Sequence, residues 1–162
     1  MIRQWWTLFR DRLGFRDRLG FRDRLRLRDR LGGPSRPARL GPRGEALAAR
    51  HLKRLGYKIV ARGARGQLGE LDLVAVDGRT VVFVEVKTRE SHDGGHPAEA
   101  VDAEKQRRLT RLALGYLKRH ELLECAARFD VVAITWPAGR RRPLLEHVRD
   151  AFEASGNNGM FS

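Results

Sequence analysis

The sequence predicts an α/β domain preceded by a low-complexity basic arm. Apolar residues recur at helical spacing between residues 44 and 55, and short Val-rich runs with alternating side chains follow them. A second helical segment then separates these runs from a last apolar strand. A chain of 162 residues suits one domain with an arm. We assign residues 1–42 to the arm, 43–152 to the domain and 153–162 to a flexible tail.

The arm contains a tandem repeat over residues 10–33, which reads RDRLGF, RDRLGF, RDRLRL, RDRLGG. A six-residue step turns a helix by about 240°, so the repeated leucines leave any single helical face. We therefore expect disorder, or helix only on binding. Residues 1–43 hold 13 Arg and 4 Asp, so +9 of the total formal charge of +13 lies there. Such an arm would add salt-dependent attraction to nucleic acid. There are two alternatives. The arm could contact anionic lipid, or it could be dispensable, having arisen from codon repeats or from an early start codon.

Composition narrows the class of protein further. No segment is long and apolar enough to span a membrane, and the start is too short and interrupted for a signal peptide. The single cysteine, Cys125, excludes an internal disulfide framework. We expect a cytoplasmic protein without a membrane partner.

The domain begins with a predicted helix over residues 44–55, and Gly56 is its expected C-terminal stop. Glu45 lies in the expected opening turn, where the helix dipole favours a carboxylate, so a capping role competes with any catalytic one. A strand from Tyr57 to Arg62 and a glycine-rich connection follow.

A β-hairpin is predicted around Asp77-Gly78, because this dipeptide lies between two runs rich in Val, Leu and Phe. With these two residues as the turn, the expected cross-strand pairs are Val76–Arg79, Val74–Val81, Asp72–Phe83 and Glu70–Glu85. One face is then apolar throughout, and we expect it to be core: Leu71, Leu73, Ala75, Val82, Val84 and Val86. The other face holds Val74, Val76, Val81 and Phe83 and becomes charged at one end.

The remaining elements are a polar loop, a helical region and two strands. The loop runs from Thr88 to His96, and its histidines, His92 and His96, are expected to be solvated rather than metal ligands. Residues 97–120 read as helical, with Asp102 able to cap a second piece. The last clear strand is predicted over residues 128–136, with an added edge strand over 144–148. Asp130 in the former is expected to form a local ion pair.

The charged end of the hairpin carries the chemistry. Glu70, Asp72, Glu85 and Lys87 share one face there, and these four residues are called the rim below. In the predicted register, Asp72 and Glu85 are diagonal neighbours, roughly 7–8 Å apart at the backbone. Their oxygen ligands suit Mg²⁺ or Mn²⁺, and Lys87 could orient or deprotonate a water, or stabilise charge on a phosphate. A weak, solvated Glu–Lys surface pair is the simpler explanation of the same pattern.

Asp72 followed by Glu85-Val86-Lys87 resembles the D…(D/E)-x-K signature of the restriction-endonuclease-like nuclease superfamily. More narrowly, the runs GEALAA, GELDLVAVDG, FVEVKTR and RFDVVAI resemble the YraN-like family of predicted bacterial endonucleases, which is itself similar to Holliday-junction resolvases. Two departures are present: Leu71 replaces the superfamily's proline, and residues 61–66 replace the family's usual Asn-Trp pair.

The resemblance implies a restriction-endonuclease-like core with a mixed β-sheet flanked by helices, in the order αβββαβ. It implies a divalent metal, Mg²⁺ or Mn²⁺, and DNA as substrate. By motif position Asp72 and Glu85 would be metal ligands, Lys87 the catalytic lysine and Glu45 an added acidic group. Candidate nucleic-acid contacts are Lys105, which matches a family lysine, with Arg108, Arg62 and Arg65. For any one of the basic residues of the helix, an ordinary solvated face is the simpler explanation.

Three functions remain in competition. The first is a metal-dependent DNA nuclease, acting on branched or damaged DNA. The second is a non-cleaving nucleic-acid-binding module on the same fold, and the third a partner-binding protein whose charged rim is structural. The complete set of Asp72, Glu85 and Lys87 favours the first. A resolvase-like activity would favour a homodimer.

Overall fold

A computed structural model of the chain describes residues 40–90, 101–139 and 141–155, apart from the side chain of Leu40. Most of the predicted arm, the loop with His92 and His96, and the end of the predicted tail lie outside these residues. The elements are α3 (Leu40–Arg54), β1 (Lys58–Gly66), β2 (Gly69–Asp77), β3 (Thr80–Arg89), α4 (Ala103–Arg119), β4 (Ala127–Thr135) and β5 (Leu144–Phe152).

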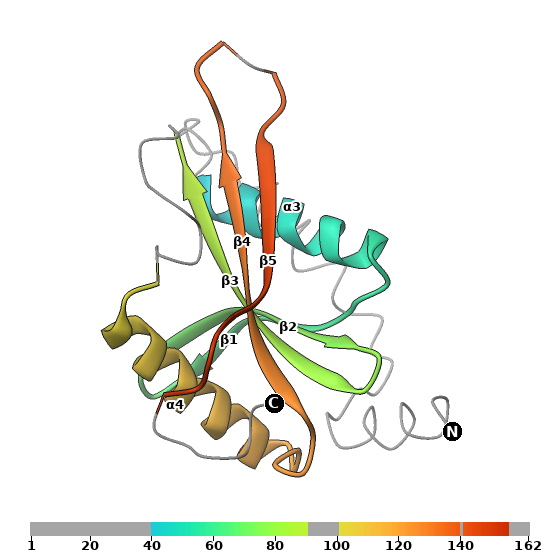
Figure 1. Ribbon diagram of the computed structural model, residues 1–162, viewed down its shortest axis with the longest axis vertical. Helices are drawn as coiled ribbons and strands as arrows, with labels where there is room; N and C mark the ends of the chain where they lie inside the picture. The colour runs from blue at the N-terminus through green and yellow to red at the C-terminus, as the bar shows by residue number, and fades with distance from the viewer. Residues whose placement is uncertain (1–39, 91–100, 140, 156–162) are drawn as a thin grey trace, which may run out of the picture.

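The five strands form one mixed sheet in the order β1-β2-β3-β4-β5. All neighbouring strands are antiparallel except β3 and β4, which are parallel and joined through α4. Helix α4 covers one face of the sheet and α3 the other (Figure 1). The predicted αβββαβ order and the mixed α/β class are therefore confirmed, with β5 as the added edge strand.

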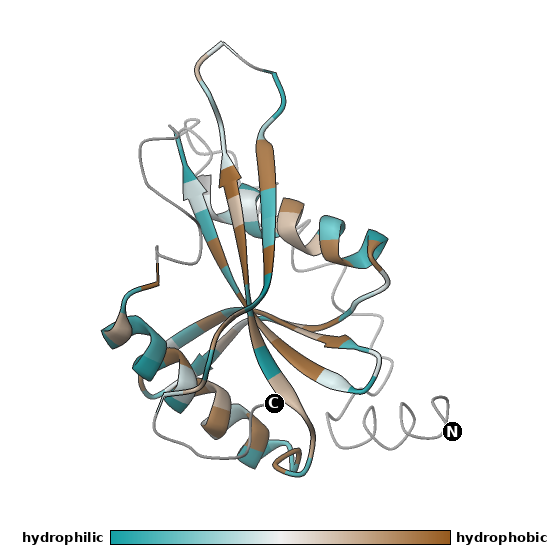
Figure 2. Cartoon of the chain, viewed as in Figure 1, coloured by the Kyte–Doolittle hydropathy of each residue, from teal (hydrophilic) through white to brown (hydrophobic). Residues whose placement is uncertain are grey.

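Two apolar clusters fill the space between the helices and the sheet. On the α4 face, Phe83 and Phe129 of the sheet pack with Leu109, Leu112 and Leu117 of the helix. On the α3 face, Leu52 and Ala48 pack with strand residues such as Leu73, Val84 and Ile134. Because helices cover both faces, β3 and β4 are buried or half-buried along their whole length, and Figure 2 shows hydrophobic stretches along the strands.

Helix α3 ends where the sequence predicts. Gly56 has φ 92°, its amide donates to Lys53 O at 3.1 Å, and the Tyr57 amide donates to Leu52 O at 3.0 Å. This pair of hydrogen bonds is a Schellman motif, which needs a left-handed residue after the helix. The helix starts earlier than predicted, at Leu40, so Glu45 lies beyond the first turn. The expected dipole-capping role of Glu45 is wrong, because that effect fades within the first turn.

Replacing Gly56 with alanine is expected to lower the free energy of unfolding by about 1 kcal/mol, because a Cβ disfavours the left-handed conformation. Space is not the reason, since a Cβ there would meet no atom within 4 Å. Urea unfolding of the two proteins measures the difference. Gly41→Ala is the matched control, since Gly41 is also open to a Cβ but has no positive φ. Equal losses at both positions would contradict this explanation.

The predicted hairpin is present, but its register is two residues from the predicted one. Asp77 pairs with Thr80, Val76 with Val81 and Val74 with Phe83, so Gly78-Arg79 is the turn. Gly78 has the positive φ, 61°. Asp77 stays in β2 because its Oδ2 accepts hydrogen bonds from Arg128 and Arg149, which are distant in sequence.

The alternation along β2 also breaks, which the sequence analysis did not predict. Leu73 packs on the α3 face as expected, but Leu71 packs in the cluster under α4. The facing strand β1 is irregular at the same level, where Gly63 has φ 55°. Residues 63–66, expected to be a loop, continue β1 and pair with β2. Asp72 therefore lies at a distortion of its strand, between two side chains that face opposite ways.

The other expectations for the fold are met with small shifts. Strand β3 continues through Arg89 into the expected loop. Asp102 caps α4 as predicted, since its Oδ1 accepts from the Lys105 amide at 2.7 Å. Strand β4 has Val131, Val132 and Ile134 fully buried. No helix among the described residues is long and apolar enough to cross a membrane.

Candidate active site

Asp72, Glu85 and Lys87 meet where β2 distorts and β3 approaches its carboxyl end. The β2–β3 ladder ends at the Leu73–Val84 pair, so Asp72 and Glu85 are level with each other rather than diagonal. In place of a ladder bond, the Val86 amide donates to Asp72 Oδ2 at 2.8 Å. The Asp72 side chain is thus held against the strand that carries Glu85 and Lys87.

Glu85 is buried, with 7% of its surface exposed, and lies between two lysines. Lys87 Nζ is 3.5 Å from Glu85 Oε1, and Lys105 Nζ donates to the same oxygen. Lys105 lies in the first turn of α4, directly after the Asp102 cap, and from there its ammonium reaches Glu85 of β3. Lys105 was predicted to be a nucleic-acid contact, and its contact with Glu85 was not predicted. The family lysine at this position was the only available signal.

Asp72 is the rim carboxylate whose proton affinity is raised. Burial, and then the negative charge of Glu85, raise the pKa of Asp72 from 3.8 to about 6. The Val86 amide and Lys105 act in the opposite direction, and Glu45 adds to the repulsion. Two close, partly desolvated carboxylates are a site that a cation would stabilise.

Glu45 joins this field from the other face of the sheet. Burial raises its pKa, Glu70 raises it further, and Arg62 opposes the shift. Helix α3 comes close to β3 here: a Cβ on Gly44 would overlap Thr88 Oγ1 and lie 3.6 Å from Val86 Cγ1. Glu45 is therefore close enough to the rim for its charge to raise the pKa of Asp72.

The two lysines differ in their electrostatics. Burial lowers the pKa of Lys87 below its ordinary value, and the neighbouring Lys105 lowers it further. Burial also acts to lower the pKa of Lys105, but the hydrogen bond to Glu85 overrides this and raises it. Lys105 is thus held as the ion-pair partner of Glu85, while Lys87 is the amine that more readily gives up its proton.

The donor set fits a hard divalent cation such as Mg²⁺ or Mn²⁺. Asp72 Oδ1 and Glu85 Oε2 take part in none of the contacts above, and either carboxylate could offer this oxygen to an ion. Among the described residues, no three Asp, Glu, His or Cys side chains are arranged to hold a metal by themselves. Mg²⁺ commonly binds through one or two carboxylates, with water and substrate phosphate as its other ligands.

The predicted nucleic-acid contacts lie around this rim. Arg108 is exposed on α4, and Arg65 is exposed near the end of β1. Arg65 pairs with Glu70 at 3.3 Å, so Glu70 belongs to a surface ion pair. Arg62 is half-buried and influences Glu45.

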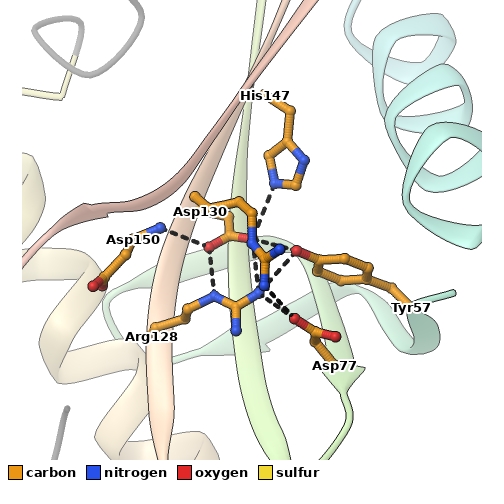
Figure 3. Close-up of polar contacts among 7 residues, drawn as sticks. Tyr57, Asp77, Arg128, Asp130, His147 and Asp150 are labelled. Atoms are coloured by element: carbon orange, nitrogen blue, oxygen red, sulfur yellow. Dashed lines mark hydrogen bonds and ion pairs between the residues drawn. The ribbon is translucent and has the colours of Figure 1, made fainter. Parts of the chain in front are cut away.

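A second polar cluster lies on the α3 face around Asp130, which is completely buried (Figure 3). Arg128 Nε donates to Asp130 Oδ1 at 3.0 Å, which confirms the predicted local ion pair. Burial alone would raise the pKa of Asp130, but hydrogen bonds from His147, Arg128 and the Asp150 amide bring it below its ordinary value. Tyr57 also donates to this carboxylate, at 3.3 Å.

This second cluster is separate from the rim. Asp130 pairs with Val84, which packs on the α3 face, whereas Glu85 pairs with Val131, which packs under α4. The sheet therefore lies between the two carboxylates. Asp130 belongs to the packing of the sheet rather than to the candidate metal site.

Comparison with known proteins gives a consistent result. Residues 44–134 match the family described as Uncharacterised protein family UPF0102. The chain is 47% identical over 127 residues to a UPF0102 protein of Rhodopirellula baltica, covering 76% of each chain. It is 50% identical over 114 residues to one of Geobacter sulfurreducens, covering 70% of this chain and 88% of the relative. It is 50% identical over 113 residues to one of Rhodococcus opacus, covering 70% and 95%.

Proposed function

Because the chain belongs to the uncharacterised protein family UPF0102, the YraN-like family that its motifs resemble, we propose its chemistry from the site itself: metal-dependent hydrolysis of DNA phosphodiester bonds. The observation that carries this proposal is the meeting of Asp72 and Glu85, two desolvated carboxylates, with Lys87 at one end of the sheet. Burying like charges together costs stability unless a cation or a proton intervenes.

Each residue has a defined part in this reaction. Asp72 and Glu85 would hold Mg²⁺ or Mn²⁺, and Glu45 is the next carboxylate in the same field. When bound, the ion would polarise the phosphoryl oxygen and lower the pKa of an attacking water. Lys105 fixes the Glu85 side chain through their ion pair.

Lys87 would orient the attacking water and take its proton. Its lowered pKa favours this, because a general base must be deprotonated for part of the time at working pH. Once protonated, the ammonium would stabilise the charge on the phosphate. Lys87 is half-buried, so water screens this charge less than it would at the surface.

A panel of single-stranded, duplex, flap and four-way DNA tests the proposal with the full chain. We expect cleavage of at least one substrate in millimolar Mg²⁺ or Mn²⁺ and none in EDTA. No cleavage of any substrate in either ion would overturn the enzyme proposal, including the possible action on branched DNA.

Replacing Lys87 with methionine is expected to slow cleavage roughly 10²–10⁴-fold, which is typical for loss of a general acid or base. Binding of DNA, measured by fluorescence anisotropy in EDTA, should change little. Lys87→Arg is the informative control, because arginine keeps the charge but does not release its proton. If Lys87→Arg retains most of the rate, the proton-transfer role is wrong and only the electrostatic role stands.

One observation favours a second function, a nucleic-acid-binding module without catalysis. Lys105 already neutralises Glu85, which lets the rim fold without a metal ion. The two functions give different results with DNA. The module would bind the panel in low salt without metal-dependent cleavage, and it would be indifferent to Lys87→Met.

A further inference from the structure

Basic residues form a stripe along one side of α4, starting from the rim and interrupted at Gly115. Lys105, Arg108, Arg111 and Arg119 follow one another at spacings of three, three and eight residues, with Gly115 between the last two. Residues three or four apart in a helix are surface neighbours, so these positions share one side. All but Lys105 are exposed. In Figure 1, α4 passes the β1–β2 hairpin, which it contacts.

The stripe leads into a pocket between α4 and the β1–β2 hairpin, with a volume of about 190 Å³. Three arginines line it: Arg65 from the hairpin, and Arg111 and Arg119 from the helix. No Asp or Glu is among its lining residues, all of which the structure describes. Arg119 Nη1 also donates to the Arg65 carbonyl at 3.3 Å, which ties the hairpin to the helix. Arg65 also pairs with Glu70, so Arg111 and Arg119 are the guanidinium groups that an anion in this concave site would contact.

Gly115 forms part of this pocket, and no packing contact explains it. A Cβ there would meet no atom within 4 Å, so a larger residue would fit. Glycine in an exposed helix interior costs about 0.5–1 kcal/mol relative to alanine. A missing side chain between two arginines leaves the helix backbone open to close approach by a ligand.

We propose that this pocket, named here the α4 pocket, binds a backbone phosphate of the nucleic acid whose scissile bond lies at Asp72 and Glu85. The proposal rests on the proposed function and adds the path of the substrate. Leu71, next to Asp72 in β2, also lines the pocket, which shows that the two sites adjoin. Ten residues of helix separate Lys105 from Gly115, about 15 Å. At about 3.4 Å per nucleotide of duplex, the bound phosphate lies on the order of four nucleotides from the cleaved bond.

The test measures DNA binding by fluorescence anisotropy in EDTA, where cleavage is absent, at several salt concentrations. The double variant Arg111→Gln/Arg119→Gln is expected to weaken binding at least tenfold. Each lost phosphate contact should also reduce the slope of log K against log salt by about 0.9. The control is Arg50→Gln/Arg54→Gln, which removes the same charge from exposed positions on α3, at the opposite face of the sheet. We expect less than a twofold change for it.

A second pair of variants keeps every arginine and so guards against a folding defect. Gly115→Glu places a carboxylate one helical turn from both Arg111 and Arg119, while Gly115→Gln has the same shape without the charge. We expect Gly115→Glu to bind DNA several-fold more weakly than Gly115→Gln, with both at least as heat-stable as the wild type.

The outcomes separate this inference from the proposed function. In one outcome wild type binds and cleaves DNA, the two double variants lose the same affinity for DNA, and the two Gly115 variants bind equally. The α4 pocket is then not a phosphate site, while the nuclease proposal stands. If wild type binds no DNA even in low salt, both proposals fall.

Discussion

Replacing Asp72 with asparagine is expected to abolish metal-dependent DNA cleavage while making the metal-free protein more stable. Asparagine keeps the shape and can still accept the Val86 amide hydrogen bond at Oδ1. It removes the charge that would hold the metal, so we expect a loss of about 10³-fold or more, comparable to removing a key electrostatic group. Cleavage of the best substrate from the DNA panel measures it.

The stability gain follows from the pKa of Asp72, which is raised to about 6 in the native protein from 3.8. Between pH 3.8 and about 6 the native state binds more protons than the unfolded chain. Protonated Asp72 therefore stabilises the native fold at low pH, and this contribution is lost as the pH rises through about 6. The Asp72→Asn protein lacks this loss. In EDTA its advantage should open between about pH 4 and 6 and reach about 2–3 kcal/mol at neutral pH.

Glu70→Gln is the matched control, because it removes an acidic charge from the same strand at a surface ion pair. We expect near-normal cleavage and a change in stability below about 1 kcal/mol. An Asp72→Asn protein that cleaves normally would show that Asp72 holds no essential metal. One that is less stable than wild type at pH 7 would show that its charge is satisfied within the protein.

The faces of the hairpin were predicted correctly in large part although its register was not. The dipeptide Asp77-Gly78 predicted the turn, but Asp77 is retained in β2 by Arg128 and Arg149, more than 50 residues away. Local turn preferences cannot report such contacts. A slip of two residues preserves the alternation of side chains. Val74 and Phe83 therefore remain on the α4 face despite the wrong pairing.

The break in alternation beside Asp72 was beyond the sequence argument for a related reason. Strict alternation assumes a regular ladder, and Gly63 on the neighbouring strand departs from one with φ 55°. A backbone in this left-handed region departs from regular strand geometry and can redirect the side chains around it. Leu71 turns to the α4 face as a result, and it lines the α4 pocket.

The charged rim shows what a motif can and cannot predict. Spacing alone predicted that Glu85 and Lys87 share a side of their strand, and the structure places their side chains 3.5 Å apart. The contact of Lys105 with Glu85 depends on where α4 starts relative to β3. The Asp102 cap sets that start. Its position in the sequence was recognised, but its position in space required the fold.

Replacing Asp130 with asparagine is expected to destabilise the protein by about 3–5 kcal/mol, the usual cost of removing one partner from a buried charge pair. Asp130 is completely buried and accepts hydrogen bonds from Arg128, His147 and the Asp150 amide. The asparagine leaves the Arg128 charge without its buried counter-charge. Urea unfolding at pH 7 measures the loss, and Asp77→Asn, which loses a more exposed partner of Arg128, should cost about 1 kcal/mol.

The pH dependence of stability should change in the same variant. The pKa of Asp130 is lowered in the native protein, so this carboxylate stabilises the fold above its ordinary pKa of 3.8 and the contribution is lost as the pH falls through the lower native value. The difference in unfolding free energy between wild type and Asp130→Asn should therefore shrink in acid below about pH 4. A difference that stays constant into acid would show that the charge of Asp130 is not what stabilises this cluster.

Measurements of cleavage separate the role of Asp130 from that of Asp72 in the rim. Asp130 and Glu85 lie on opposite faces of the sheet, so folded Asp130→Asn protein, assayed well below its melting temperature, should cleave DNA at close to the wild-type rate. Loss of cleavage at a temperature where the variant is folded would place Asp130 in the reaction after all. Suppose that Asp130→Asn is destabilised but still cleaves, while Asp72→Asn is stabilised but does not cleave. Asp130 then serves the packing of the sheet and Asp72 the chemistry. A residue selected for packing stabilises the fold, whereas one selected for catalysis is kept at a cost to stability.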